Sequence, residues 1–254
     1  MAMSLVGWFL ENMINQLKKI YIQEQFKPSV LGLFINPFYF ARRGLYKNIC
    51  KLIGSLEGRL LDVGCGSKPY ESICQVDEYI GLEIDTIENR KNKKADYFYN
   101  GRSMPFEDES FDSLISNQVF EHVFNPDEFL KEINRVTKDN GVLLLTVPFV
   151  WDEHEQPYDY ARYSSFGLTH ILNKNGFEVV EHIKSNNGVE VIFQLINDYI
   201  FKLTLTRNVF VNLLSTLVLM APINIIGLVL SKILPRNNDL YLDNIVLARK
   251  VEDV

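Results

Sequence analysis

The sequence contains the residue types of a nucleotide-type cofactor site. They are carboxylates and a pair of glycines, and they lie at the ends of short apolar runs. The run at 60–63 leads into a Gly-Cys-Gly turn at 64–66, where glycines let the backbone approach a ligand closely. A helix expected directly after this turn would add free N–H groups. About 20 residues later a second apolar run ends in Glu83, whose carboxylate can accept hydrogen bonds from both hydroxyls of a ribose. The candidate cofactor residues are Asp62, Gly64, Gly66 and Glu83.

A second group of reactive side chains lies in the aromatic-rich segment 148–163, which follows another predicted strand. Ligands of open parallel sheets bind beyond the carboxyl ends of the strands, so this loop is expected to cover a substrate. His154 can act as a base because imidazole titrates near neutrality, and Arg162 can bind a carboxylate or phosphate. A structural alternative stays open, in which Asp159 and Arg162 form an ion pair that only fixes the loop. The substrate-binding candidates are Tyr158, Arg162 and Tyr163.

Composition and charge exclude several classes of function. With 32 acidic and 26 basic residues the net charge is −6, so no overall basic field is available to bind nucleic acid phosphates. The three cysteines show no CxxC spacing, which predicts neither a disulfide framework nor a zinc site and fits a reducing cytoplasm. In the loop, His154 is a single histidine without a spaced partner, although Glu155 and Asp159 are near it in sequence, so no metal site is expected.

The segments that must position these residues alternate between short apolar runs and amphipathic stretches. Strands are expected at 60–63, 79–83, 96–99, 112–116, 142–147, 177–183 and 241–249. Besides the helix after the glycine turn, helices are expected at 126–138 and 164–175. Strands interleaved with helices in this way predict a doubly wound α/β sheet covered on both faces.

Two further segments differ in character from this alternating core. Apolar residues recur at helical spacing over 5–22, and a second helix is expected at 38–56, which together predict a helical cap. Another segment, 189–238, is apolar and almost entirely helical in pattern. The expected division of the chain is a cap at 1–57, a core at 58–188, an insertion at 189–238 and a last strand at 239–254.

The insertion contains an uncharged stretch, 208–231, which exceeds the roughly 20 residues that a membrane-spanning helix needs. Pro222 interrupts this stretch, and a single crossing would leave the last strand on the wrong side of the membrane from its sheet. Two short helices broken near Pro222 are therefore expected. Their apolar faces are expected to dip into one membrane leaflet, or to pack against the N-terminal helix or a second subunit, and packing on the same domain is the remaining alternative.

Five segments occur in the order found in class I S-adenosylmethionine-dependent methyltransferases. Residues 62–66 resemble the first motif of that family, and Glu83 resembles its ribose-binding acid. Three further segments resemble the loop before the family's fourth strand, the segment after that strand, and the fifth strand: 104–112, 119–123 and 140–145. The resemblance extends roughly over residues 40–185 and the last strand. It implies a Rossmann-like methyltransferase sheet, mostly parallel, with an antiparallel last strand.

The resemblance also implies roles for residues outside the glycine turn. Ile84 and Met104 would flank the adenine, while Asn117 and Gln118 would face the methionine moiety and the reaction centre. Asn100 stands where the family often has an aspartate that accepts a hydrogen bond from the adenine amino group, and an amide oxygen can accept the same bond. The resulting additions to the cofactor-binding set are Cys65, Ile84, Asn100, Met104, Asn117 and Gln118.

The expected function is transfer of a methyl group from S-adenosylmethionine to an oxygen or nitrogen of a small-molecule, glycan or lipid-linked acceptor, with His154 as the base. The protein is expected in the cytoplasm, with peripheral membrane or homodimer contacts through 189–238. No nucleic acid partner is expected, because 116–119 lacks the Asn-Pro-Pro-Tyr pattern of enzymes that methylate amino groups of nucleic acids.

Two alternatives to this function remain at the level of sequence. A NAD-dependent oxidoreductase would be expected to show G-x-G-x-x-G, whereas here Lys68 and Pro69 follow Gly66. The proline also biases Lys68 to an extended backbone, in a turn where many methyltransferases have a third glycine. A non-catalytic protein that binds the cofactor or a partner chain on the same fold can be separated from an enzyme only by measuring activity.

Overall fold

The computed structural model describes residues 5–251, except for the side chains of 5–10 and 14, and the chain forms two compact units. The sheet unit comprises residues 47–185 together with the C-terminal strand that follows residue 240. The helical unit combines the N-terminal part of the chain, up to residue 46, with residues 186–240. The N-terminal helices and the insertion, which were expected as separate segments, therefore share one unit.

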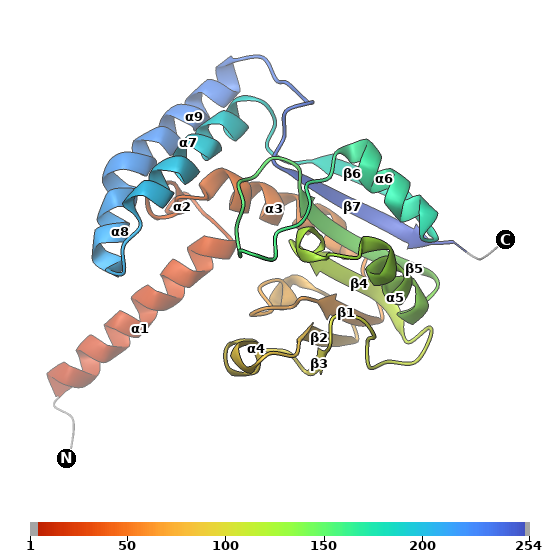
Figure 1. Cartoon of the computed structure of the whole chain (residues 1–254). Helices are drawn as coiled ribbons and strands as arrows, with labels where there is room; N and C mark the ends of the chain where they lie inside the picture. The colour runs from red at the N-terminus through yellow and green to blue at the C-terminus, as the bar shows by residue number, and fades with distance from the viewer. Residues whose placement is uncertain (1–4, 252–254) are drawn as a thin grey trace. The chain divides into compact units, whose positions relative to one another are not determined.

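The sheet unit is built on a seven-stranded sheet with the strand order β3-β2-β1-β4-β5-β7-β6 (Figure 1). Its strands are β1 (Arg59–Val63), β2 (Glu78–Ile84), β3 (Tyr97–Tyr99), β4 (Phe111–Asn117), β5 (Thr137–Pro148), β6 (Phe177–Lys184) and β7 (Asp243–Lys250). Strands β1 to β5 pair in parallel, and β7 runs antiparallel to both of its neighbours, β5 and β6. The predicted fold class, a mostly parallel doubly wound sheet with an antiparallel last strand, is confirmed.

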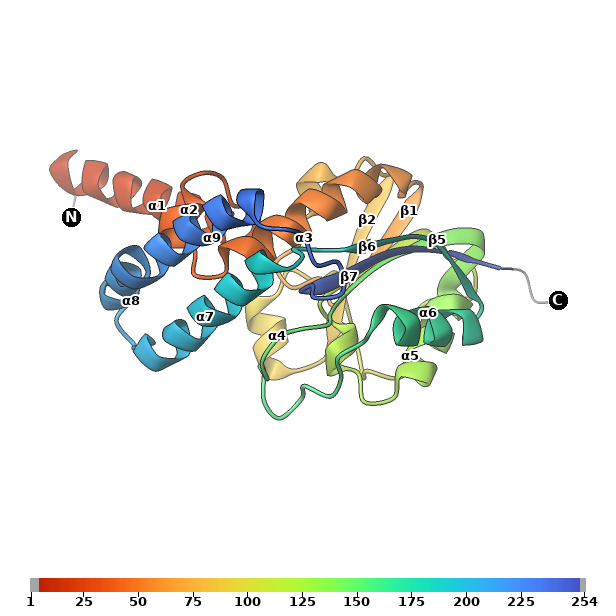
Figure 2. The same cartoon turned by 90° about the horizontal axis from the view of Figure 1, so that it is seen from above.

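Helices and short 3-10 turns connect these strands. They are η1 (Ile53–Ser55), η2 (Glu71–Ile73), α4 (Ile87–Asn92), η3 (Phe120–His122), α5 (Pro126–Val136) and α6 (Ser165–Lys174). Helices α5 and α6 cover one face of the sheet (Figure 2), where Leu130 and Leu168 share an apolar cluster with Leu143 and Leu145 of β5. The apolar runs of the central strands are needed because both of their faces are buried.

The strand order reverses between β1 and β4, which lie side by side at the centre of the sheet. Ligands of doubly wound sheets bind outside the carboxyl ends of the strands at such a switch point. The glycine turn at 64–66 follows β1, and η3 follows β4. The topology therefore brings together, at one edge of the sheet, two segments that are about 55 residues apart in sequence.

The predicted helix after the glycine turn is wrong. Between β1 and β2 the structure has only η2, a single 3-10 turn. Lys68 was also expected to be extended but adopts a left-handed backbone with φ of 55°, and its N–H donates to the carbonyl of Cys65. Pro69 then follows without an N–H donor, so a helix cannot continue from this tight turn. A cofactor at the turn accordingly meets individual backbone N–H groups and not the N-terminus of a helix.

The helical unit contains α1 (Leu5–Phe26), α2 (Gly32–Ile35), the first half of α3 (Tyr39–Leu52), α7 (Val189–Thr204), α8 (Val209–Ser215), the π-helical turn η4 (Thr216–Met220) and α9 (Ala221–Ile233). Leu33, Tyr39 and Phe40 from its N-terminal part pack against Phe193 and Leu228 from the insertion. This common apolar core explains why the two segments form one unit, because neither could bury these side chains alone.

The predicted break near Pro222 is also wrong. Helices α8 and α9 join through η4 into one helix, Val209–Ile233, which is long and apolar enough to cross a membrane although only 28% of its most apolar window is buried. The proline lies in the first turn of α9, directly after the wider π-helical turn. A π-helical turn is one of the local adjustments that lets a helix continue past a residue without an N–H group.

Candidate functional site

The glycine turn depends on its two glycines for its shape. Gly64 and Gly66 have φ angles of 75° and 53°, in the left-handed region that favours glycine. A Cβ atom on Gly64 would overlap the side chain of Val119, in the segment after β4. Backbone N–H groups of Gly64 and Cys65 donate to the carbonyl of Leu82, at 2.9 and 3.2 Å. The turn is thus held between β2 and the segment that follows β4.

Glu83 lies at the same turn, as its predicted role in cofactor binding requires. Its side chain is buried, and its Oε2 accepts a hydrogen bond of 3.1 Å from the N–H of Gly66. The other oxygen, Oε1, accepts from the N–H of Ile84 at 3.2 Å. The carboxylate at the end of β2 is therefore aligned against the backbone of the turn after β1.

Asp62, on β1, is buried and accepts a hydrogen bond of 2.5 Å from the hydroxyl of Tyr79 on β2. Burial raises the pKa of Asp62 to about 7, although the hydrogen bond from Tyr79 acts in the opposite direction. Burial also raises the pKa of the Cys65 thiol, to about 12, so this cysteine carries no thiolate at neutral pH. The structure leaves Asp62 as an ionisable group beside the turn, whereas Cys65 fills space between the two glycines.

A lysine that the sequence analysis treated only as a departure from the family pattern holds this loop in place. The Nζ of Lys68 lies 2.5 Å from Oδ2 of Asp96, and the same oxygen accepts from the N–H of Gly81 at 2.7 Å. The side chain of Lys68 is almost fully buried even though it carries the charge. The ion pair therefore ties the loop after β1 to Asp96, directly before β3. In the sequence, only the Lys68-Pro69 pair in the turn indicates that this lysine has a structural role.

The three residues predicted to contact the adenine, Ile84, Met104 and Asn100, differ in how well their surroundings suit that role. Met104 is buried, and Ile84 is 45% exposed at the end of β2, so an apolar face is available there. The Oδ1 atom of Asn100, however, already accepts hydrogen bonds from the N–H groups of Arg102 and Ser103, at 2.9 and 3.1 Å. The oxygen expected to bind the adenine amino group is thus used in a local turn.

Asn117 and Gln118 lie at the carboxyl end of β4, where the resemblance places them. The hydroxyl of Thr146 on β5 donates to Oδ1 of Asn117 at 2.8 Å, and it accepts from the N–H of Gln118 at 3.1 Å. Gln118 has a left-handed backbone with φ of 55°, which turns the chain sharply as it leaves the strand. The pair is therefore oriented by Thr146 of β5, a contact that the sequence did not identify.

Arg162 holds the loop after β5 together. Its guanidinium donates to both carboxylate oxygens of Asp159, at 2.6 Å each, and to the carbonyls of Trp151, Asp152 and Ala161. Burial would raise the pKa of Asp159, but the hydrogen bonds from Arg162 and from the backbone of His154 lower it to about 2. Because all five N–H donors of Arg162 are used, the structure favours the alternative in which this pair fixes the loop.

The two substrate-binding tyrosines have different environments. Tyr158 is 62% exposed, so its ring is free to meet an incoming molecule. The ring of Tyr163 stacks on Phe120 with 4.8 Å between centroids and packs against the main apolar cluster of the sheet unit. The arrangement suits Tyr158 to substrate contact and makes Tyr163 part of the support beneath the loop.

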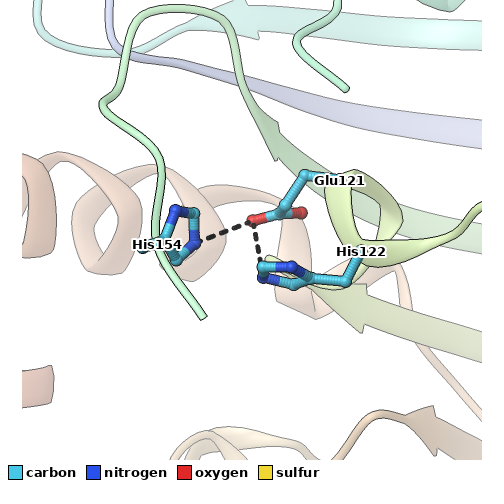
Figure 3. Close-up of side chains that lie close together, drawn as sticks. All are labelled: Glu121, His122 and His154. Carbon is cyan, nitrogen blue, oxygen red and sulfur yellow. Dashed lines mark ion pairs between the residues drawn. The ribbon is translucent and has the colours of Figure 1, made fainter. Parts of the chain in front are cut away.

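The loop brings His154 to a buried carboxylate that sequence reasoning missed. His154 Nε2 and His122 Nε2 each lie 3.9 Å from Oε1 of Glu121, in η3, and all three side chains point toward one another (Figure 3). Glu121 has no exposed side-chain surface, and burial raises its pKa to about 8. In the sequence, the only indication of this cluster is that a carboxylate and an imidazole, Glu121 and His122, are adjacent in the segment after β4. The imidazole of His122 thus joins that of His154 beside this carboxylate.

Comparison with known proteins agrees with this geometry. Residues 61–145 match a family model described as a methyltransferase domain. The chain is 29% identical over 97 residues to the ubiquinone biosynthesis O-methyltransferase of Pelagibacter ubique, an alignment that covers 34% of this chain and 40% of that protein. The chain matches about half, or less, of the length of the first curated relatives, with 38%, 54%, 45% and 40% of each covered.

Two solved structures show the same fold at low sequence identity. One is an S-adenosylmethionine-dependent methyltransferase from Mesorhizobium loti, with a TM-score of 0.51, 10% identity, and 83% of this chain and 100% of that chain covered. The other is phosphoethanolamine N-methyltransferase 2 of Haemonchus contortus in complex with S-adenosyl-L-methionine. Its TM-score is 0.51 at 18% identity, and the alignment covers 90% of this chain and 59% of that one.

The strand order, the glycine turn with its acid at the end of β2, and the domain match define a class I S-adenosylmethionine-dependent methyltransferase. The domain match covers residues 61–145, and the Haemonchus contortus structure with the same fold is a complex with S-adenosyl-L-methionine. The sheet topology confirms the resemblance found in the sequence.

Proposed function

We propose that the protein transfers a methyl group from S-adenosylmethionine to an oxygen or nitrogen of a small-molecule, glycan or lipid-linked acceptor. The observation that carries this proposal is the contact between Glu83 Oε2 and the N–H of Gly66, which joins the predicted ribose acid to the glycine turn at the switch point of the sheet. An acid aligned in this way can accept hydrogen bonds from ribose hydroxyls while the turn stays close to the rest of the nucleoside.

The chain's own residues would then position two reactants. Asp62, Gly64 and Gly66 would surround the methionine end of the cofactor, with Asn117 and Gln118 nearer the reaction centre. When bound, the cofactor supplies a methyl group on an already activated sulfonium. Because most of the rate can come from holding the acceptor in line with that methyl group, the protein needs few catalytic side chains beyond a base.

His154 is the proposed base. Its Nε2 is directed toward the interior beside Glu121, and its backbone N–H donates to Asp159 at 2.9 Å. The side chain is 30% exposed, so a bound acceptor can reach it. Arg162 holds Asp159, and Asp159 in turn holds the backbone of His154, which explains why an ion pair in the loop serves the reaction without touching the acceptor.

Mass spectrometry of candidate acceptors tests the reaction. Glycans, isoprenoid metabolites and phenolic metabolites incubated with the protein and methyl-deuterated cofactor are expected to give one product heavier by a single labelled methyl group. Omitting the protein gives the background. If calorimetry shows that the cofactor binds while no acceptor gains the label, the non-catalytic alternative on the same fold replaces this proposal.

We also propose that the helical unit binds to a membrane surface. Most of the exposed large apolar side chains of the described residues belong to this unit, and Phe210, Leu214 and Val218 on the long helix are 82%, 60% and 58% exposed. A water-exposed surface of this kind is typical of contact with lipid or with another protein. Basic Arg207 precedes the helix and Lys232 lies in its last turn, and both suit an anionic lipid face.

The interior of the helical unit supports this proposal, because it contains buried polar side chains although the surface of the unit is apolar. Asn197 on α7 donates to Asn224 on α9 at 2.8 Å, and Asn224 donates to the carbonyls of Leu33 and Asn36 at 3.0 and 3.2 Å. These amides are buried. An amide network between helices holds them together where lipid contributes no hydrophobic driving force.

An in-plane position on one membrane face is favoured over a crossing. Strand β7 follows the long helix and pairs with β5 and β6 in the same sheet, so the chain must return to the side from which it left. A second crossing helix could return the chain to that side, and α7, which packs along α9, is the candidate. Its buried Gln194 and Asp198 make a membrane-spanning position of α7 unfavourable.

Vesicle sedimentation measures the membrane contact. Replacing Phe210 and Val218 together by glutamate is expected to lower the fraction bound to phosphatidylcholine–phosphatidylglycerol vesicles roughly fivefold, because two apolar contacts are lost and two negative charges face an anionic surface. The matched control is Phe166→Glu on α6 in the sheet unit, a residue that is 86% exposed. A wild-type protein that ignores vesicles would contradict the membrane contact. A dimer in analytical ultracentrifugation that the double variant splits would assign the surface to a second subunit.

A further inference from the structure

Three donor atoms from two segments converge beside the predicted reaction centre. They are Oε1 of Glu121, Nε2 of His122 and Nε2 of His154, and all lie within 4.8 Å of one another. Glu121 and His122 come from η3 after β4, and His154 comes from the loop after β5. A pair of histidine nitrogens with one carboxylate oxygen is a frequent ligand set for zinc and related divalent ions.

The carboxylate of Glu121 lacks a partner that its burial demands. Its side chain has no exposed surface, and neither oxygen accepts a hydrogen bond from another residue among those that the structure describes. A buried carboxylate without donors is costly, so it binds a cation or takes up a proton. The carboxylate points to the space between the two imidazoles (Figure 3), which is where a cation would be needed.

Both histidines are oriented in the way that metal-binding histidines are. The Nδ1 of His122 is 2.9 Å from the carbonyl oxygen of Tyr158. The Nδ1 of His154 is 3.2 Å from Oδ2 of Asp159 and 3.3 Å from the carbonyl oxygen of Asp152. Each Nδ1–H therefore has an oxygen acceptor, which places the lone pair of each neutral ring on the Nε2 that faces Glu121.

A guanidinium nitrogen of Arg162 also lies 3.4 Å from Nδ1 of His154, but it donates at shorter distances to Asp159 and to the Asp152 carbonyl, 2.6 and 2.7 Å. With these two oxygens closer to the ring nitrogen than the arginine is, the tautomer with hydrogen on Nδ1 is favoured. The carbonyl of Asp152, which is hydrogen-bonded to Nδ1, then matches the outer partner that usually orients a metal-bound imidazole, and the carboxylate of Asp159 lies next to it.

We propose that Glu121, His122 and His154 bind one divalent transition metal ion, with Zn²⁺ the best fit to the ligand set. In a tetrahedral site with Zn–N bonds of about 2.0–2.1 Å, ligand atoms lie about 3.3 Å apart. The 3.9 Å from Glu121 Oε1 to each imidazole nitrogen requires closure by about half an ångström. The two imidazole nitrogens lie within 4.8 Å of each other and must approach by up to about 1.5 Å, which rotation of both side chains can supply. Glu155, with Oε2 at 3.9 Å from His122 Nε2, is placed to supply a fourth ligand or to leave that position to the acceptor.

The metal changes how His154 takes part in the proposed reaction. With Nε2 bound to the ion, His154 is no longer a free base and acts through the ion, which polarises an acceptor hydroxyl or amine held at its open position. This consequence rests on the proposed function, whereas metal binding itself does not. The two are therefore tested separately, with binding measured in the absence of cofactor and acceptor.

Titration with Co²⁺ and Zn²⁺ tests the site. After dialysis against a chelator, the full chain is expected to bind one Co²⁺ per molecule with the visible absorption bands of a low-coordinate site, and Zn²⁺ is expected to displace it. Glu121→Gln, His122→Ala and His154→Ala are each expected to weaken binding roughly tenfold or more. The matched control is His170→Ala, an exposed histidine on α6 that lies outside the cluster.

The result that overturns the proposal is a wild-type chain without these absorption bands, or bands that all three variants retain. Thermal unfolding followed by circular dichroism checks each variant, and Glu121→Gln is the most informative because it keeps the shape of the side chain and removes only its charge. A chain that transfers methyl groups but binds no metal would retain the proposed function and refute the metal site.

Discussion

His154→Ala is expected to lower the turnover of methyl transfer roughly 10²-fold or more, and to leave the affinity for S-adenosylmethionine unchanged. The imidazole is the titratable group of the loop whose ring reaches the buried Glu121, while its backbone supports Asp159. Alanine removes the ring and keeps the backbone N–H, so the bond to Asp159 survives. Turnover numbers with a saturating acceptor and cofactor, together with calorimetry, separate the effect on chemistry from an effect on binding.

The control for this change is His170→Ala, because its imidazole is exposed on α6 and away from the loop. Its turnover is expected to equal that of the wild type. If His154→Ala also turns over normally, the histidine has no chemical role and the loop after β5 only covers the site. A loss of turnover that occurs together with a loss of bound metal would assign the effect to the cluster with Glu121 and His122.

Glu83→Ala and Asp62→Ala are each expected to weaken binding of S-adenosylmethionine and of its demethylated product tenfold or more, about 1.4 kcal/mol. Glu83 is the acid that lies against the glycine turn, and Asp62 is the buried carboxylate at the end of β1. Each variant removes hydrogen-bond acceptors that the cofactor's hydroxyl or amino groups would meet. Isothermal titration calorimetry measures the dissociation constants directly.

The matched control is Glu78→Ala, on the same strand as Glu83 but at its opposite end and paired with Arg59 in an exposed ion pair. Its affinity for the cofactor is expected to remain that of the wild type, since an exposed ion pair contributes little to stability. Heat from NADH in place of S-adenosylmethionine would overturn the cofactor assignment and restore the oxidoreductase alternative.

The strands could be predicted because burial on both faces demands continuous apolar runs, and these are visible in the sequence. The glycine turn and Glu83 could be predicted for a similar reason, since a tight turn before a ligand needs residues without a Cβ atom. Local constraints of this kind leave a record at the positions themselves. In the structure Glu83 lies at this turn and accepts a hydrogen bond from the N–H of Gly66, and its role in binding a ribose stays a prediction.

Local patterns failed where a tertiary contact changed the outcome. The helix expected after Gly66 does not form, because Lys68 turns back to Asp96 and is followed by proline. The break expected at Pro222 does not occur, since the π-helical turn η4 absorbs the missing hydrogen bond. In both places a neighbouring residue's conformation decided between two structures that the local sequence allows.

By itself, the sequence determined the sheet and its cofactor turn, because both depend on residue types at fixed short spacings. Only the tertiary structure decided that the N-terminal helices share a core with residues 186–240, and that Glu121 and His122 meet His154. Such contacts depend on how strands pair and where loops fold back. His122 and His154, for example, are 32 positions apart in the sequence. Burial then left Glu121 without a donor from any other residue that the structure describes, a property of its surroundings that no residue type can reveal.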